Sequence, residues 1–170
     1  KERKKQRNKE TKERKEKVVT ALQKAIQAKS YSGEEKGVVE YLEKLFKDIG
    51  YDTVHIDHYG NIIGCIKGKK NGLKVLMDGH MDTVPVQEEK WKENAFGGEV
   101  KDGKIYGRGT SDMKGALISM VLAGAYFAED TKKDFSGEIY VAGIVHEECF
   151  EGVAAREDRK STRLNSSHIT

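Results

Sequence analysis

The sequence predicts an α/β fold in which helices pack on a mixed, largely parallel sheet. Segments with apolar residues at helical spacing alternate with short apolar runs that are bounded by glycine-containing turns. This alternation is typical of domains in which helices cover a sheet. A chain of 170 residues is long enough for one such domain with a hydrophobic core.

Two helices are expected in the N-terminal part of the chain. Residues 1–17 carry ten Lys or Arg and four Glu without an apolar face, which indicates a solvated helix or a disordered leader. From Val18 onward, apolar residues recur at helical spacing. In the second helix, Ser32 and Glu35 are spaced as a capping box and Gly50 provides the stop. Its expected buried stripe is Val38, Val39, Leu42, Leu45, Phe46 and Ile49.

The remainder is predicted to form strands, turns and one further helix. Strands are expected over 51–57, 62–68, 73–79, 104–107 and 137–148, and a helix over 116–128. The strand over 73–79 is expected to be covered on both faces, because its apolar residues scarcely alternate with polar ones. A glycine-rich loop precedes the helix.

Histidine and carboxylate residues follow two of these strands and occupy the glycine-rich loop. His80 and Asp82 come directly after one strand, and their spacing of two places both side chains on one face of an extended chain. Glu147 and Glu148 end another strand, and Asp112 lies in the loop. Because ligand sites in α/β sheets gather at the carboxyl ends of strands, we expect these side chains at one rim.

This set of side chains suits a divalent metal ion. Carboxylates a few Å apart repel, and most of them would take up protons without a cation. Imidazole with carboxylate oxygens is a zinc-type ligand set, and a carboxylate behind a ligating histidine can fix its tautomer. Each motif alone also fits a simpler interpretation: a surface turn for His-x-Asp, an ordinary strand end for the glutamates, and a helix N-cap for Asp112. Their conjunction favours the metal.

The other histidines and the cysteines are not expected in this site. His55 and His58 are interpreted as surface residues. His146 would point away from Glu147 on an extended strand, so it is interpreted as a packed residue or as one that supports a ligand, and not as a ligand itself. Cys149 is interpreted as a space-filling residue. Neither it nor Cys65 has disulfide or metal-site spacing, which favours a reducing, cytoplasmic setting. No segment approaches the roughly 20 apolar residues of a membrane helix.

Three motifs in this order resemble the family of zinc-dependent aminoacylases, acetylornithine deacetylases, succinyl-diaminopimelate desuccinylases and carboxypeptidases. They are GHMDTVP at 79–85, GRGTSDMKG at 107–115 and HEE at 146–148. The resemblance covers residues 18–152 and implies the first part of a di-zinc exopeptidase-like catalytic domain. The segments GRGTSDMKGA and EECFEG are most similar to a hydrolase subgroup linked with selenium metabolism.

The resemblance also implies a role for each of the five residues. His80 would bind the first of two metal ions, Asp112 would bridge both and Glu148 would bind the second. Asp82 would orient His80, and Glu147 would be the general base of amide hydrolysis. The expected ions are Zn²⁺, with Co²⁺ or Mn²⁺ as alternatives. A cis peptide bond after Asp112 is expected as well.

The family pattern divides the chain into three parts: a basic leader at 1–17, the N-terminal part of a catalytic domain at 18–157, and residues 158–170. The last part matches a translated short-read sequencing adapter, so we expect the native sequence to end near Glu157. The family implies a further carboxylate, a late histidine and a lid or dimerisation domain beyond that point. The incomplete chain is therefore expected to hydrolyse little and to expose a sheet edge.

The sequence thus predicts a cytoplasmic, metal-dependent hydrolase that cleaves an amide bond of a small N-acylated amino acid or short peptide. That substrate is the expected partner, together with a homodimer formed through the further domain; neither nucleic acid nor membrane is expected as a partner. The alternative is a non-catalytic paralogue or a binding module that uses the basic leader. Stoichiometric zinc distinguishes the two, because only the hydrolase needs it.

Overall fold

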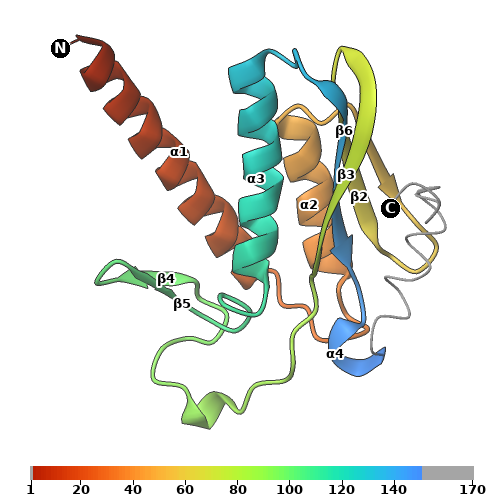
Figure 1. Cartoon of the computed structure of the whole chain (residues 1–170). Coiled ribbons are helices and arrows are strands. Elements are labelled where there is room, and N and C mark those ends of the chain that lie inside the picture. The colour runs from red at the N-terminus through yellow and green to blue at the C-terminus, as the bar shows by residue number, and fades with distance from the viewer. Residues whose placement is uncertain (1, 151–170) are drawn as a thin grey trace.

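The computed structural model describes residues 2–150, so the predicted boundary at 157 and the segment 158–170 lie outside the described residues. In chain order the elements are α1 (Glu2–Gln27), α2 (Lys36–Asp48), β1 (Thr53–Ile56), β2 (Ile62–Lys67), β3 (Lys70–His80), a 3₁₀ turn (Glu88–Lys90), β4 (Glu99–Lys101), β5 (Lys104–Tyr106), α3 (Lys114–Thr131), β6 (Ser136–Ile144) and α4 (Glu147–Phe150) (Figure 1). The sequence predicted that the two glutamates end a strand over 137–148. They instead begin the short helix α4, because β6 ends at Ile144.

The sheet is mixed, and its strand order is β1-β2-β6-β3. β1 and β2 form an antiparallel hairpin, β2 pairs with β6 antiparallel, and β3 pairs with β6 in parallel. The predicted α/β architecture is confirmed, but among the described strands only one of these three pairings is parallel. The short turn between β1 and β2 accounts for the first antiparallel pairing, because so few residues can only reverse the chain.

The helices supply one side of the core. In Figure 1, α2 and α3 lie on the same side of the sheet, with α1 beside α3. Phe46 of the predicted α2 stripe is fully buried, and a Cβ added at Gly64 would lie 2.6 Å from its ring. A glycine in the middle of β2 thus lets α2 approach the sheet closely. Of the predicted stripe, Val38, Val39, Leu42 and Phe46 are buried, while Leu45 and Ile49 are partly buried.

The charged leader is helical, because α1 continues without a break from Glu2 into the apolar segment. Most of its charged residues are exposed. Arg14 is partly buried, donates to Asp130 at the end of α3 and lies over the Tyr126 ring. Such exposed pairs contribute at most about 1 kcal/mol each. None of the described helices is long and apolar enough to cross a membrane.

The amino half of β3 is not covered, which corrects the expectation that this strand is buried on both faces. β3 lies at an edge of the sheet, with β6 as its only partner among the described strands. Leu73 is 81% exposed and Val75 is 52% exposed. An apolar groove of about 480 Å³ runs from these two residues to Phe127 and Phe135. The apolar run was correctly predicted to form a strand, but the prediction that both of its faces are buried is wrong for the amino half.

Candidate metal centre

The parallel pairing of β3 with β6 brings the predicted residues to one rim. His80 is the last residue of β3 and is paired with Ile144, the last residue of β6. The backbone N–H of Met81 extends this ladder to the Ile144 carbonyl at 2.8 Å. The chain that leaves β6 therefore places Glu147 and Glu148 beside His80.

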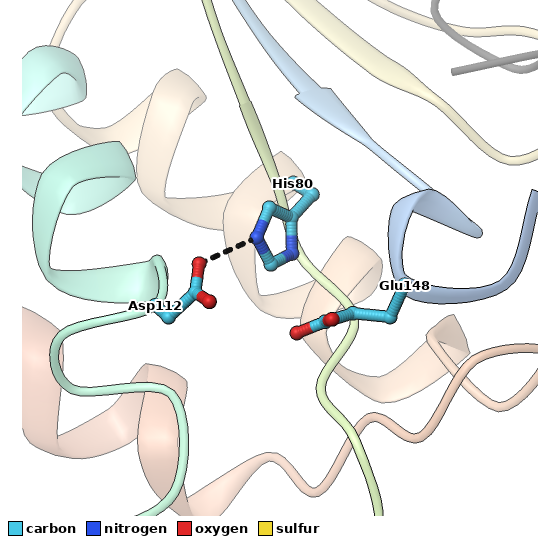
Figure 2. Close-up of side chains that lie close together, drawn as sticks. All are labelled: His80, Asp112 and Glu148. Atoms are coloured by element: carbon cyan, nitrogen blue, oxygen red, sulfur yellow. Dashed lines mark hydrogen bonds and ion pairs between the residues drawn. The ribbon is translucent and has the colours of Figure 1, made fainter. Parts of the chain in front are cut away.

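Three side chains from separate segments converge at this rim. His80 comes from the end of β3, Asp112 from the loop before α3 and Glu148 from α4 (Figure 2). One ligand atom of each lies within 4.8 Å of the others, and His80 Nε2 is 3.0 Å from Asp112 Oδ1. The imidazole is buried, whereas Asp112 is exposed. The cluster is consequently anchored in the protein and open to solvent on one side.

The His80 ring is held from behind by Asp82. Nδ1 lies 2.9 Å from the Asp82 backbone oxygen and 3.4 Å from Oδ1 of its carboxylate. Both groups are acceptors, so Nδ1 carries a proton and Nε2 faces Asp112. Burial lowers the pKa of His80, but hydrogen bonds to Asp82 and Asp112 outweigh it and raise the pKa to about 9.

The Asp82 carboxylate is fully buried and organises the surrounding backbone. It accepts hydrogen bonds from Ser32 Oγ at 2.6 Å and from the N–H groups of Glu147 and Glu148, both at 3.1 Å. Burial alone would raise the pKa of Asp82. The hydrogen bonds from His80, Ser32 and the two amides reverse this effect and lower it to about 2. Asp82 therefore links the histidine to the glutamate pair.

The two glutamates differ in position. Glu147 Oε2 lies 3.9 Å from His80 Nε2, with a half-exposed side chain, while Glu148 belongs to the converging triad. The pKa of Glu148 is raised by burial and by the nearby charges of Asp112, Glu147 and Asp82, against the opposing charge of His80. A bound cation reduces the electrostatic repulsion between these carboxylates, and carboxylate oxygen and imidazole donors suit a divalent cation. The described residues thus fit a metal.

Asp112 is presented by a loop that a buried lysine anchors. Lys114 is 1% exposed and donates to the backbone oxygens of Ala25 and Ala28 at the end of α1. The predicted cis peptide bond between Asp112 and Met113 is present. The N-cap of α3 is Met113 without a side-chain cap bond, so the interpretation of Asp112 as an N-cap is wrong. Its carboxylate is directed at His80 instead.

Three polar residues near the site were not recognised from the sequence as part of it. Ser32 and Glu35 do not form the expected capping box, because α2 has no side-chain cap bond. Ser32 donates to Asp82, while buried Glu35 accepts from the N–H of His146 at 3.1 Å. Asn61, which is fully buried, accepts from the N–H of Val145 at 3.0 Å. No local sequence pattern indicates these contacts, because the partners of Glu35 and Asn61 lie 111 and 84 residues away.

The remaining histidines and cysteines lie outside the triad. His55 and His58 are exposed, as expected. His146 has φ of 58°, so the chain is not extended there, and its Nδ1 lies 3.9 Å from Glu35. Cys149 is exposed, which contradicts its interpretation as a space-filling residue, because α4 turns this position towards solvent.

Comparison with known proteins assigns the chain to a family. The family model described as "Peptidase family M20/M25/M40" matches residues 76–162, just over half of the chain. The matched segment contains His80, Asp112, Glu147 and Glu148.

Individual relatives are similar over most of this chain. Succinyl-diaminopimelate desuccinylase of Cereibacter sphaeroides is 29% identical over 136 residues, which cover 78% of this chain and 36% of the relative. The uncharacterised protein YgeY of Escherichia coli K12 is 38% identical over 125 residues, which cover 73% and 30%. The chain therefore spans about a third of the length of these relatives.

Solved structures show the same fold. The dipeptidase Dug1p of Saccharomyces cerevisiae superposes with a TM-score of 0.69 at 20% identity, covering 86% of this chain and 35% of the enzyme. YXEP of Bacillus subtilis, described as a dinuclear metal-binding peptidase of the M20 family, also has a TM-score of 0.69, at 15% identity, covering 91% and 41%. With its family match, its fold and its convergent histidine and carboxylates, the chain belongs to the M20/M25/M40 peptidase family.

Proposed function

We propose that this chain forms part of a metal-dependent hydrolase that cleaves an amide bond of a small N-acylated amino acid or a short peptide. The observation that carries the proposal is the convergence of His80, Asp112 and Glu148 within 4.8 Å, with Glu147 beside them. Similar proteins, a desuccinylase and a dipeptidase, support this class of substrate. Because the chain spans about a third of their length, the activity is proposed for the whole protein.

The three converging residues are the proposed ligands of two divalent ions, most simply Zn²⁺. His80 and Asp112 would hold one ion, and Asp112 and Glu148 would hold the other. When bound, such ions polarise a scissile carbonyl and acidify water. Co²⁺ and Mn²⁺ suit the same donor atoms, so the choice of Zn²⁺ is a separate part of the proposal from the position of the site.

Glu147 is the proposed general base. Its carboxylate is half-exposed and lies next to the ligands, so it can accept a proton from water at the site and return it to the leaving amine. Asp82 keeps one proton of His80 on Nδ1, so that Nε2 can give up its own proton and offer its lone pair to the metal. These two carboxylates serve the reaction without needing to bind metal.

The proposal also includes a cellular compartment and an oligomeric state. Both cysteines of the described chain are free thiols, which is typical of a reducing compartment and supports a cytoplasmic location. A homodimer formed through the part of the protein outside this chain remains part of the proposal, as does a small-molecule or peptide partner.

A pair of matched substitutions tests the two glutamate roles. Glu148→Gln should weaken Zn²⁺ binding by this chain about 10-fold or more, whereas Glu147→Gln should leave binding within a fewfold of the original. Affinity is measured by competition with a chromophoric chelator. Equal loss in both variants, or none in either, would refute the division of roles.

Hydrolysis is tested in a chimera that supplies the remainder of the protein. Residues 18–150 replace the aligned segment of the Cereibacter desuccinylase, and the chimera is assayed on N-succinyl and N-acetyl amino acids and on dipeptides. Glu147→Gln should abolish a chelator-sensitive activity and retain bound zinc. A zinc-loaded, folded chimera that hydrolyses none of these compounds would favour the non-catalytic alternative.

A further inference from the structure

The segment that carries the glutamate pair is held by a row of buried acceptors. Four consecutive backbone N–H groups, those of residues 145–148, each donate to a side chain from a distant part of the sequence. Asn61 accepts the first, Glu35 the second, and the two oxygens of Asp82 the third and fourth. All three acceptors are at most 5% exposed.

This row of acceptors coincides with an abrupt change in backbone direction. β6 ends at Ile144, α4 begins at Glu147, and His146 between them has φ of 58°. A left-handed conformation is unfavourable for a residue other than glycine and persists only where the surroundings enforce it. The acceptors for the amides of Val145 and His146 lie directly at this reversal.

Asn61 is itself oriented by the β1–β2 turn. Asp57 Oδ1 accepts the N–H groups of Tyr59, Gly60 and Asn61, and Asp57 Oδ2 accepts Asn61 Nδ2 at 2.8 Å. Because the carboxylate can only accept, the amide group of Asn61 must donate towards Asp57. Its oxygen is thereby directed at the N–H of Val145.

We infer that Glu35 and the Asp57–Asn61 pair are positioning residues that set the direction of Glu147 and Glu148 at the metal centre. This inference rests on the proposed function. None of the three touches the metal ligands' donor atoms; they act through the backbone that presents the glutamates. A displacement of this backbone would move Glu148 away from His80 and Asp112, and so reduce metal affinity.

The hydrogen-bond polarity allows a reciprocal test. In Asp57→Asn, two amide NH2 groups can face each other. Flipping the amide at position 57 directs its NH2 at the N–H groups of residues 59–61, and flipping Asn61 directs its NH2 at the N–H of Val145, so either flip leaves donors facing donors. In Asn61→Asp, two carboxylates face each other at the position of the 2.8 Å contact. In the exchange Asp57→Asn/Asn61→Asp, each donor again meets an acceptor, and the Val145 N–H regains its partner.

The readout is binding of Co²⁺ to the purified chain, followed by its visible absorption and by competition with a chelator, with folding checked by circular dichroism. Each single variant should bind Co²⁺ about 10-fold more weakly or worse, and the exchange should restore most of the loss. Asp102→Asn, in the exposed β4–β5 turn, is the matched control and should change nothing.

Two variants of Glu35 test the positioning role independently, and they suffice if the single variants of Asp57 and Asn61 do not fold. Glu35→Gln keeps an acceptor oxygen for the N–H of His146, whereas Glu35→Leu removes it. Co²⁺ affinity should be nearly unchanged in the first and fall about 10-fold in the second.

Two results would separate the possible failures. If the original chain does not bind Co²⁺, the proposed metal centre fails and the positioning role falls with it. If the original chain binds Co²⁺, and folded Glu35→Leu and the folded turn variants bind it equally well with only a lower Tm, these residues stabilise the fold alone. The positioning inference is then overturned, while the proposed function stands.

Discussion

The two halves of β3 provide opposite environments within one strand. At its carboxyl end Gly79 and His80 are buried, and the polar groups around them are paired. In its amino half Leu73 and Val75 are exposed at the sheet edge. The site end is therefore built from contacts within the described residues, whereas the amino half presents apolar surface and one unpaired strand edge to solvent.

This difference predicts where substitutions should change the free energy of unfolding most. At the carboxyl end, long-range hydrogen bonds converge on buried groups, so one lost partner leaves several buried polar atoms unsatisfied. In the amino half of the strand, the side chains of Leu73 and Val75 are exposed. We therefore expect large effects at the first end and small effects at the second.

The largest effect is expected at Asp82. Asp82→Ala removes the fully buried acceptor for Ser32 Oγ and for the backbone amides of Glu147 and Glu148. The free energy of unfolding should fall by about 3 kcal/mol or more, as measured by urea denaturation. Asp78→Asn, an exposed change on the same strand, should alter it by less than about 0.5 kcal/mol. Similar losses in both variants would remove the contrast on which the comparison depends.

Lys114 comes next in expected magnitude. Lys114→Met keeps the volume of the side chain but leaves the carbonyls of Ala25 and Ala28 without their buried donor. We expect a loss of about 2 kcal/mol in urea denaturation. Exposed Lys104→Met serves as the control, with no measurable change. A Lys114 variant as stable as the original would show that α1 does not depend on this anchor.

In the amino half of β3, substitution should change association and not stability. Leu73→Lys places a charge on an edge strand where the side chain is 81% exposed. Unfolding free energy should stay within about 0.5 kcal/mol, and concentration-dependent light scattering should decrease, because lysine on an edge opposes strand pairing. Val100→Lys, on the separate β4–β5 hairpin, should leave scattering unchanged. Marked destabilisation by Leu73→Lys would mean that this half is packed after all.

A small, pH-dependent effect is expected at Asp52, which accepts from Lys133 Nζ at 2.6 Å and from the N–H of Lys67 at 2.8 Å. Burial raises the pKa of this carboxyl, but these hydrogen bonds outweigh it and the pKa is lowered. The stabilisation is therefore present above the ordinary aspartate pKa and is lost as the pH falls through the lowered folded-state value. Asp52→Asn should cost at most about 1 kcal/mol at pH 7.

Thermal melts at several pH values check the sign of this effect. The difference between the original chain and Asp52→Asn should shrink as the solution becomes acidic. A difference that grows in acid would contradict the lowered pKa of Asp52.

Much of the site could be predicted because its ligands occupy recognisable motifs. His80, Asp112 and Glu148 each lie at a strand or helix end within a short pattern, and they converge as expected. Their roles as metal ligands stay a prediction. Asn61 and Glu35 were missed because their partners are 84 and 111 residues away, and such contacts leave no local pattern.

Two errors of interpretation have similar physical origins. Ser32 and Glu35 satisfy the spacing of a capping box, but tertiary partners at Asp82 and His146 compete successfully for both side chains. The apolar run of β3 predicts a strand correctly, yet burial depends on neighbours that the run itself does not specify. Local patterns were thus reliable for element type and unreliable for tertiary partners.

The central claim is that His80, Asp112 and Glu148 hold divalent metal. The most direct measurement is an anomalous difference map from a crystal of the chain soaked with zinc. We predict two peaks: one about 2.0–2.2 Å from His80 Nε2 and one carboxylate oxygen of Asp112, and one at a similar distance from the other Asp112 oxygen and a carboxylate oxygen of Glu148. A map without density there, or with zinc only at surface histidines such as His58, would contradict the claim.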